Sequence, residues 1–188
     1  MRNILILAAV AFFAACNSSQ PAPTETAAPA KDSTVREINS PYPVSYSSKF
    51  AIGDPKNAES ILTLWKDYEN GNILSGHKEL FADSIELYLS DGTIIRGRRD
   101  SVIAIVQQHR NMASTVVDRV DAVTALRSTD KNENWVLIWG MEKTTAKNGK
   151  VDSVNLQETW RLNNDGKVNL LYQYVQAAAP PKKLTAKK

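Results

Sequence analysis

The stretch that most restricts how this chain can fold is 154–176, in which two long segments flank a turn that ends at Gly166. Along each segment large apolar side chains alternate with polar ones, a pattern typical of strands with one buried face. A three-residue turn with Gly166 in the left-handed conformation pairs Leu162 with Val168, and only this register aligns the two apolar rows. A shift of one residue would bury the wrong row. The stretch therefore predicts an antiparallel hairpin.

A second hairpin is predicted directly before the first. The strand at 135–145 is joined to the strand that carries Glu158 through Asn-Gly at 148–149, which is typical of a two-residue turn. This turn places Trp139 opposite Glu158, and the last hairpin places Tyr172 on the other side of Glu158. We therefore expect a carboxylate between an indole and a phenol, in the middle of three antiparallel strands.

The first half of the domain has the pattern of helices. Asp54 suits a helix N-cap and Pro55 suits the first helical position, and apolar residues then recur along one stripe. A short helix is expected at 73–80 and another helix at 98–112, with a small hairpin between them. Helices followed by long antiparallel strands predict an α+β domain of about 125 residues, at 50–176.

This order of elements resembles the nuclear transport factor 2-like superfamily, and within it the SnoaL-like branch, across nearly all of 54–176. The resemblance is carried by Gly71-Asn72 after the first helix, Phe81-Ala82-Asp83 at the first strand, Gly97 before the last helix, and Asp165-Gly166-Lys167 in the last hairpin. It implies a cone-shaped fold in which a strongly bent antiparallel sheet wraps around three helices and encloses a pocket. It also implies a homodimer through the outer face of the sheet, for which the apolar row of Val136, Ile138 and Gly140 is a candidate.

The resemblance does not select one activity, because the superfamily includes isomerases, dehydratases, polyketide cyclases, ligand binders and association domains. Members similar to ketosteroid isomerase use a tyrosine on the first helix and an aspartate in the first strand. The matching positions here hold Trp65 or Lys66, and Leu89. The isomerase mechanism is therefore disfavoured unless Tyr68 and Glu158 act from new positions.

Glu158 is the candidate proton-transfer group. Burial of a carboxylate against indole rings raises its pKa and suits it to acid or base catalysis near neutral pH, and a phenol beside it can polarise a carbonyl. The catalytic residues of such an enzyme would be Glu158, Tyr172 and His109. The candidate ligand-pocket residues are Trp65, Tyr68, Trp139, Trp160 and Tyr174.

The same residues also have a structural interpretation. Aromatic residues on a helix stripe are commonly core residues, and His109 is compatible with a hydrogen-bonded histidine of the core. Glu158 would then accept hydrogen bonds from Tyr172 or from an arginine such as Arg110 and only satisfy its own burial. The sequence holds no cysteine and histidine cluster and no glycine-rich phosphate loop, so no metal and no cofactor are expected.

Two functions from different classes stay open. The first and preferred one is a domain whose aromatic pocket binds a small apolar or amphipathic molecule, or whose sheet binds a protein partner, without catalysis. The second is an enzyme that isomerises, dehydrates or cyclises its substrate with Glu158. A third, a dimerisation scaffold, would need a filled interior.

The two ends of the chain are expected to lie outside the domain. Residues 1–15 resemble a bacterial lipoprotein signal peptide, and Cys16, the only cysteine, would carry the lipid. The alternative is an ordinary secretory signal that leaves a free thiol. Residues 16–49 are rich in Ser, Pro, Thr and Ala and are expected to form a flexible tether, and 177–188 a basic disordered tail.

These features predict a lipid-anchored protein of the cell envelope, by default on the periplasmic face of the outer membrane. The formal net charge of +3 comes from the ends, since 50–176 carries 15 Lys and Arg against 17 Asp and Glu. No nucleic-acid partner is therefore expected.

Overall fold

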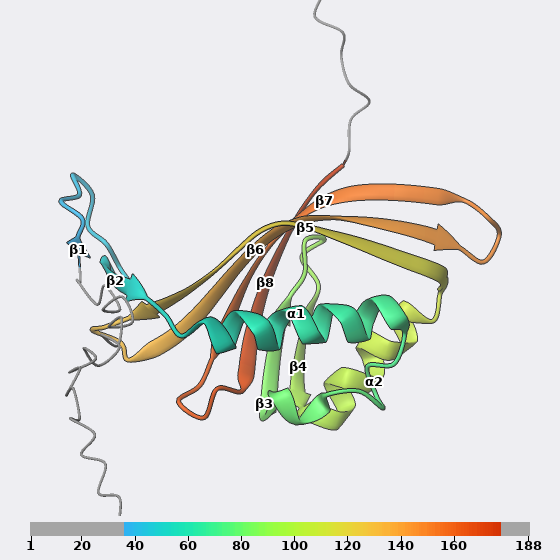
Figure 1. The fold of residues 1–188 in the computed structure, drawn as a ribbon, viewed down its shortest axis with the longest axis horizontal. Helices are drawn as coiled ribbons and strands as arrows, with labels where there is room; N and C mark the ends of the chain where they lie inside the picture. The colour runs from blue at the N-terminus through green and yellow to red at the C-terminus, as the bar shows by residue number, and fades with distance from the viewer. Residues whose placement is uncertain (1–35, 178–188) are drawn as a thin grey trace, which may run out of the picture. The chain divides into compact units, whose positions relative to one another are not determined.

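The computed structural model describes residues 36–177 (Figure 1). The predicted signal peptide at 1–15, the predicted lipidation site Cys16 and the predicted basic tail from residue 178 onward lie outside the described residues. Within 36–177, no helix combines the length and the apolar character that crossing a membrane requires.

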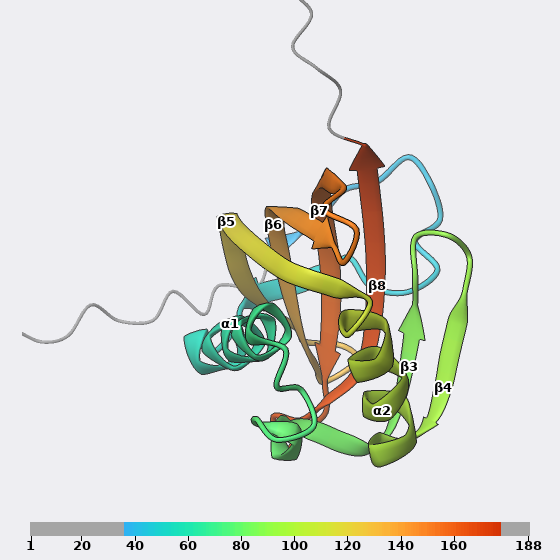
Figure 2. The same ribbon diagram turned by 90° about the vertical axis from the view of Figure 1, so that its right-hand side faces the viewer.

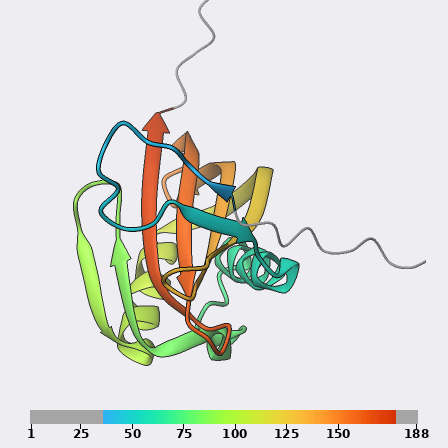
Figure 3. The same ribbon diagram turned by 90° about the vertical axis from the view of Figure 1, so that its left-hand side faces the viewer.

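The domain is a curved sheet with two α-helices on one side, as Figures 2 and 3 show from opposite directions. The helical elements are α1 (Pro55–Asn70), the single 3-10 turn η1 (Lys78–Leu80) and α2 (Arg99–Arg110). The strands are β1 (Arg36–Glu37), β2 (Lys49–Ile52), β3 (Phe81–Tyr88), β4 (Ile94–Arg98), β5 (Ala113–Ser128), β6 (Glu133–Ala146), β7 (Val151–Leu162) and β8 (Val168–Ala177). The predicted α+β class and bent sheet are confirmed, and the expected helix at 73–80 is reduced to η1.

The eight strands form one sheet in the order β1-β2-β5-β6-β7-β8-β3-β4. All neighbours are antiparallel except β3 and β8, which are parallel. The sheet also contains the last part of the segment expected to be a tether, because β1 pairs with β2 and β2 with β5. Tyr46 helps to fix this segment: its ring packs edge-on against Trp135 at a centroid distance of 5.8 Å, and its hydroxyl group donates to Glu133.

The sheet bends sharply where β5 and β6 pass α1. The pairing of these strands is interrupted between Val120 and Ala122, opposite Gly140. A Cβ atom on Gly140 would lie 2.4 Å from the carbonyl oxygen of Arg119 and 3.1 Å from the ring of Trp65. Only glycine allows both approaches, so the indole of Trp65 on α1 lies directly against the bend.

The predicted register of β6 and β7 is wrong by one residue. The turn contains three residues rather than two: Gly149, in the left-handed conformation (φ 83°), donates to the Ala146 carbonyl at 2.9 Å, and Ala146 pairs with Lys150. Ile138, and not Trp139, is therefore opposite Glu158. Trp139 points to the other face of the sheet, where 40% of its surface is exposed.

The predicted register of β7 and β8 is correct at the turn and wrong beyond it. Gly166 has the expected left-handed conformation (φ 72°) and Leu162 pairs with Val168. A bulge then shifts the pairing by one residue, so that Gln173, and not Tyr172, lies opposite Glu158. Tyr172 faces outward and stacks on Tyr88 at a centroid distance of 5.0 Å.

Because of these two shifts, the side chains of β6 and of β8 beyond its bulge that the sequence predicted to face inward face outward, and the reverse. Val136 and Ile138 are fully buried in the core instead of forming an outer surface. Trp135, Leu137 and Trp139 lie on the outer face of β6, and Tyr174, which is 57% exposed, lies beside Gln157 two strands from Trp139. The homodimer through this outer face stays a prediction, with a different set of residues.

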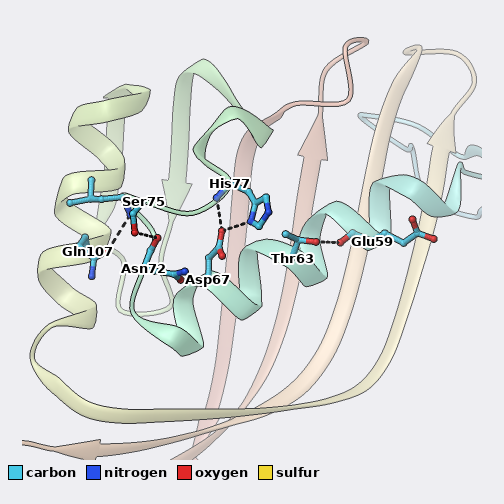
Figure 4. A network of polar contacts seen from close by, with 8 residues as sticks. Glu59, Thr63, Asp67, Asn72, Ser75, His77 and Gln107 are labelled. Atoms are coloured by element: carbon cyan, nitrogen blue, oxygen red, sulfur yellow. Dashed lines mark hydrogen bonds and ion pairs between the residues drawn. The ribbon is translucent and has the colours of Figure 1, made fainter.

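The loop after α1 is held by polar side chains of both helices (Figure 4). Buried Asp67 accepts hydrogen bonds from the backbone N–H of His77 at 2.7 Å and from its ring at 3.1 Å. Gln107 of α2 accepts from the backbone N–H of Leu74 at 3.2 Å and donates to the Gly71 carbonyl at 3.0 Å. The loop therefore fixes the spacing between α1 and α2 without a helix of its own.

Arg110 closes the C-terminal end of α1. Its buried guanidinium group donates to the carbonyl oxygens of Tyr68 at 2.7 Å and Glu69 at 2.8 Å, and more weakly to Ala113 at 3.3 Å. A cation at this end of a helix satisfies carbonyls that lack helical partners and complements the helix dipole.

Replacing Arg110 should destabilise the domain. We expect Arg110→Ala to lower the free energy of unfolding by about 3 kcal/mol, because it leaves buried carbonyls without donors. Arg110→Lys should lower the free energy of unfolding by about half as much, since lysine keeps the positive charge but lacks the planar guanidinium group with its several N–H donors. Urea unfolding followed by tryptophan fluorescence measures both, with Arg98→Ala as an exposed arginine control. If all three variants lowered the free energy of unfolding by the same small amount, Arg110 would not be the residue that caps α1.

Candidate functional site

A cavity of about 430 Å³ lies inside the domain. It is lined by side chains from both helices and from the sheet, and most of them are aliphatic or aromatic. The apolar lining includes Leu64, Trp65, Ile73, Phe81, Ile85, Leu87, Val102, Ile103, Val106, Leu156, Trp160 and Leu171. Its acidic members are Asp91, Asp118, Glu142 and Glu158, and His109 is its one basic residue.

Glu158 lies in this lining on the middle strand β7 and is 4% exposed. Its Oε2 atom accepts hydrogen bonds from the indole N–H groups of Trp65 at 2.8 Å and Trp160 at 3.0 Å. Its Oε1 atom accepts from the amide of Gln173 at 3.0 Å. Burial raises the pKa of Glu158, whereas these three hydrogen bonds act in the opposite direction.

The three donors bring α1, β7 and β8 to one carboxylate. All three are uncharged, so they satisfy its oxygens without supplying a counter-ion. Arg110, which the sequence offered as a donor, caps α1 instead. Both carboxylate oxygens are thus engaged by protein groups, the arrangement expected of a structural acid.

A second acidic site faces the same cavity. Asp118 of β5 and Glu142 of β6 are direct cross-strand partners. Burial, followed by the charge of Glu142, raises the pKa of Asp118 to about 7. The Oδ1 atom of Asp118 is buried and has no hydrogen-bond partner, whereas Glu142 accepts from the Thr144 hydroxyl at 2.8 Å. Two carboxylates therefore meet with unsatisfied acceptor capacity.

Tyr68 and His109 are two further polar residues of the lining. The Tyr68 hydroxyl lies 3.3 Å from Nδ1 of His109, so that α1 and α2 meet through these side chains. Burial, and then the charge of Glu142, raises the pKa of Tyr68 above its ordinary range. His109 is exposed at the end of α2 and is not the buried histidine of the structural interpretation.

The predicted site residues divide into two groups. The cavity lining brings together Trp65, Tyr68, His109, Glu158 and Trp160. The other three predicted residues, Trp139, Tyr172 and Tyr174, are not part of the lining and lie on the outer face of the sheet.

Five polar residues of the lining were not predicted as site residues: Asp91, Thr93, Asp118, Glu142 and Gln173. The available signal was alternation, because Glu142 shares the inward row of β6 with Ile138. Among the residues described, no group of three His, Cys, Asp or Glu side chains is arranged to hold a metal ion.

The raised pKa of Asp118 predicts a loss of stability as pH rises. Between the ordinary aspartate pKa and about 7, the folded state keeps a proton that the unfolded state has released, so the free energy of unfolding falls with rising pH. Asp118→Asn removes this titration and should stabilise the domain more at pH 8 than at pH 5. Urea unfolding at both pH values measures this. If the difference in unfolding free energy between Asp118→Asn and the wild type were the same at pH 5 and pH 8, the raised pKa of Asp118 would be contradicted.

Comparison with known proteins finds similarity in structure only. No protein-family model matches the chain, and no curated protein sequence matches it. A hypothetical protein with a ketosteroid isomerase-like fold from Catenulispora acidiphila, solved with trimethylamine, is 15% identical, with a TM-score of 0.50 over 62% of this chain and 84% of that one. A protein of unknown function from Burkholderia pseudomallei is 16% identical, with a TM-score of 0.51 over 64% and 90%. The domain therefore has the nuclear transport factor 2-like fold.

Proposed function

We propose that the domain binds a small, largely apolar molecule in its interior cavity, without catalysis by Glu158. The observation that carries this proposal is the cavity of about 430 Å³ itself, with its aliphatic and aromatic lining and few polar groups. Small-molecule sites commonly have this size and composition. A domain that served only as a dimerisation scaffold would gain stability from filling this space.

The geometry around Glu158 favours binding over acid or base catalysis at that residue. Two indoles and an amide occupy both of its oxygens, so a proton transfer would have to break contacts that hold α1 to the sheet. Tyr172, the predicted polarising phenol, lies on the outer face next to Tyr88. Glu158 thus orients the aromatic walls that a ligand would touch.

We further propose that the domain is held at the cell envelope by a lipid on Cys16, by default on the periplasmic face of the outer membrane. The support is the short apolar segment before this single cysteine. An interior apolar site on such an anchored domain suits ligands that partition between membrane and water.

Ligand binding is testable with the uncharged fluorescent dye N-phenyl-1-naphthylamine. We expect saturable binding of one dye per domain, because the apolar lining removes the dye from water. Val106→Trp, which fills the cavity from α2, should weaken binding about tenfold or more. Gln108→Trp adds the same side chain to an exposed position of the same helix and should leave the affinity unchanged. Non-saturable binding, or equal effects of both variants, would contradict the proposal.

The anchor is testable by feeding an alkyne analogue of palmitate to bacteria that produce the full chain. The wild-type protein should be labelled and recovered with membranes, because a lipid-modified cysteine carries the acyl chains. Cys16→Ala should abolish labelling, whereas Ser18→Ala should not. An unlabelled wild-type protein would sink the lipoprotein hypothesis.

A further inference from the structure

We propose that the ligand of the cavity carries a positively charged amine, which lies against Asp118 and Glu142 while its apolar part fills the rest of the space. This inference rests on the proposed function, ligand binding in the same cavity. It adds the chemical class of the ligand: a small organic cation with an apolar body.

The charge of the cavity lining favours a cation. Four carboxylate residues contribute to it, whereas no lysine and no arginine does. The nearby cations are engaged elsewhere: Lys66 pairs with Glu69 at 3.0 Å, and Arg110 donates to backbone carbonyls. A cation in the cavity would therefore meet uncompensated negative charge, and an anion would be repelled.

The acidic groups of the lining differ in how completely they are hydrogen-bonded. Glu158 has three donors, but Oδ1 of Asp118 is buried without a partner, directly across from a second carboxylate. An unpaired buried acceptor is unfavourable, and repulsion from Glu142 adds to this. A ligand ammonium group would relieve both, because it supplies positive charge and, where it carries N–H groups, donors.

Aromatic side chains of the same lining also favour a cation beside this acidic pair. Tyr68 lies in the same lining, and its pKa reflects the charges of Glu142 and Asp118. Tyrosine and tryptophan rings favour organic cations through their negative faces, and Trp65 also belongs to the lining. A bare metal ion fits less well, because in the described part of the chain no third ligand joins the pair.

The inference is tested with three probes that share a phenyl body: benzyltrimethylammonium, its uncharged carbon isostere neopentylbenzene, and the anion phenylacetate. Titration calorimetry or dye displacement at pH 8 and constant ionic strength gives their affinities. We expect the cation to bind about tenfold more tightly than the neutral isostere, and the anion to bind more weakly than either.

The variant Asp118→Asn/Glu142→Gln should abolish the preference for the cation, while neopentylbenzene still binds saturably. A charge-matched control, Glu79→Gln/Asp165→Asn, removes two exposed acids that are not part of the lining and should keep the preference. Retained binding of the neutral probe shows that the double variant is folded, and Asp118→Asn alone should give an intermediate preference.

The outcomes separate the two proposals. If neopentylbenzene does not bind, the apolar binding site itself is wrong. If it binds but the cation is not preferred, or if the preference survives in the double variant, the amine inference is wrong and the proposed function stands.

A pH series adds an independent readout. Besides that of Glu142, the charges that act on Asp118 come from Lys66 and Glu69 on α1 and from Glu158 on β7. Tyr68 on α1 is influenced by the charge of Arg110 and contacts His109, both on α2, and the Thr144 hydroxyl donates to Glu142. Because Asp118 gains its charge as pH rises through about 7, the preference for the cation should increase from pH 5.5 to pH 8. His109→Gln removes the histidine that contacts Tyr68 in the same lining. The increase should persist in that variant, and its loss there would overturn the role of Asp118.

Discussion

The position of α1 over the sheet depends on one buried carboxylate. Glu158 collects an N–H donor from α1, one from its own strand β7 and one from β8. A buried charge is tolerated only when its hydrogen-bonding capacity is satisfied, so each donor is needed where it is. The indole of Trp65 can reach Glu158 because Gly140 leaves room for the ring at the bend of the sheet. The cavity is the space that this arrangement keeps open between the helices and the strands.

Much of the fold could be predicted from the sequence because its signals are local. Helix α1 begins where Asp54 and Pro55 predict, and the turns fall at the expected glycines. The register of the strands is less local. A left-handed glycine fits a two-residue turn and a three-residue turn equally well. The bulge at Asn169, between the pairs Leu162–Val168 and Arg161–Leu170, has no sequence signal of its own. Each of these errors of one residue exchanged the two faces of a strand next to Glu158.

The difference between local signals and strand register also explains which site residues were predicted correctly. Trp65, Tyr68 and His109 lie on helices, where the inward face follows from a periodicity that needs no partner strand. Glu158 and Trp160 follow from the alternation within their own strand. Trp139, Tyr172 and Tyr174 were assigned to the site through cross-strand pairing, and all three lie outside it. Asp118 and Glu142 were missed because a charged residue in a strand is usually exposed to solvent.

The acids of the cavity show why composition alone is a poor guide to a functional residue. Glu158 is more buried than Asp118 and stands out in the sequence. Both of its oxygens already accept hydrogen bonds from the protein, so a ligand would add little to its interactions. Asp118 is less buried but lacks a partner for one oxygen and faces a like charge. Binding energy comes from interactions that the free protein leaves unmade. Under the proposed binding function, the incomplete pair, rather than the complete network, is therefore the part of the cavity that would select the ligand.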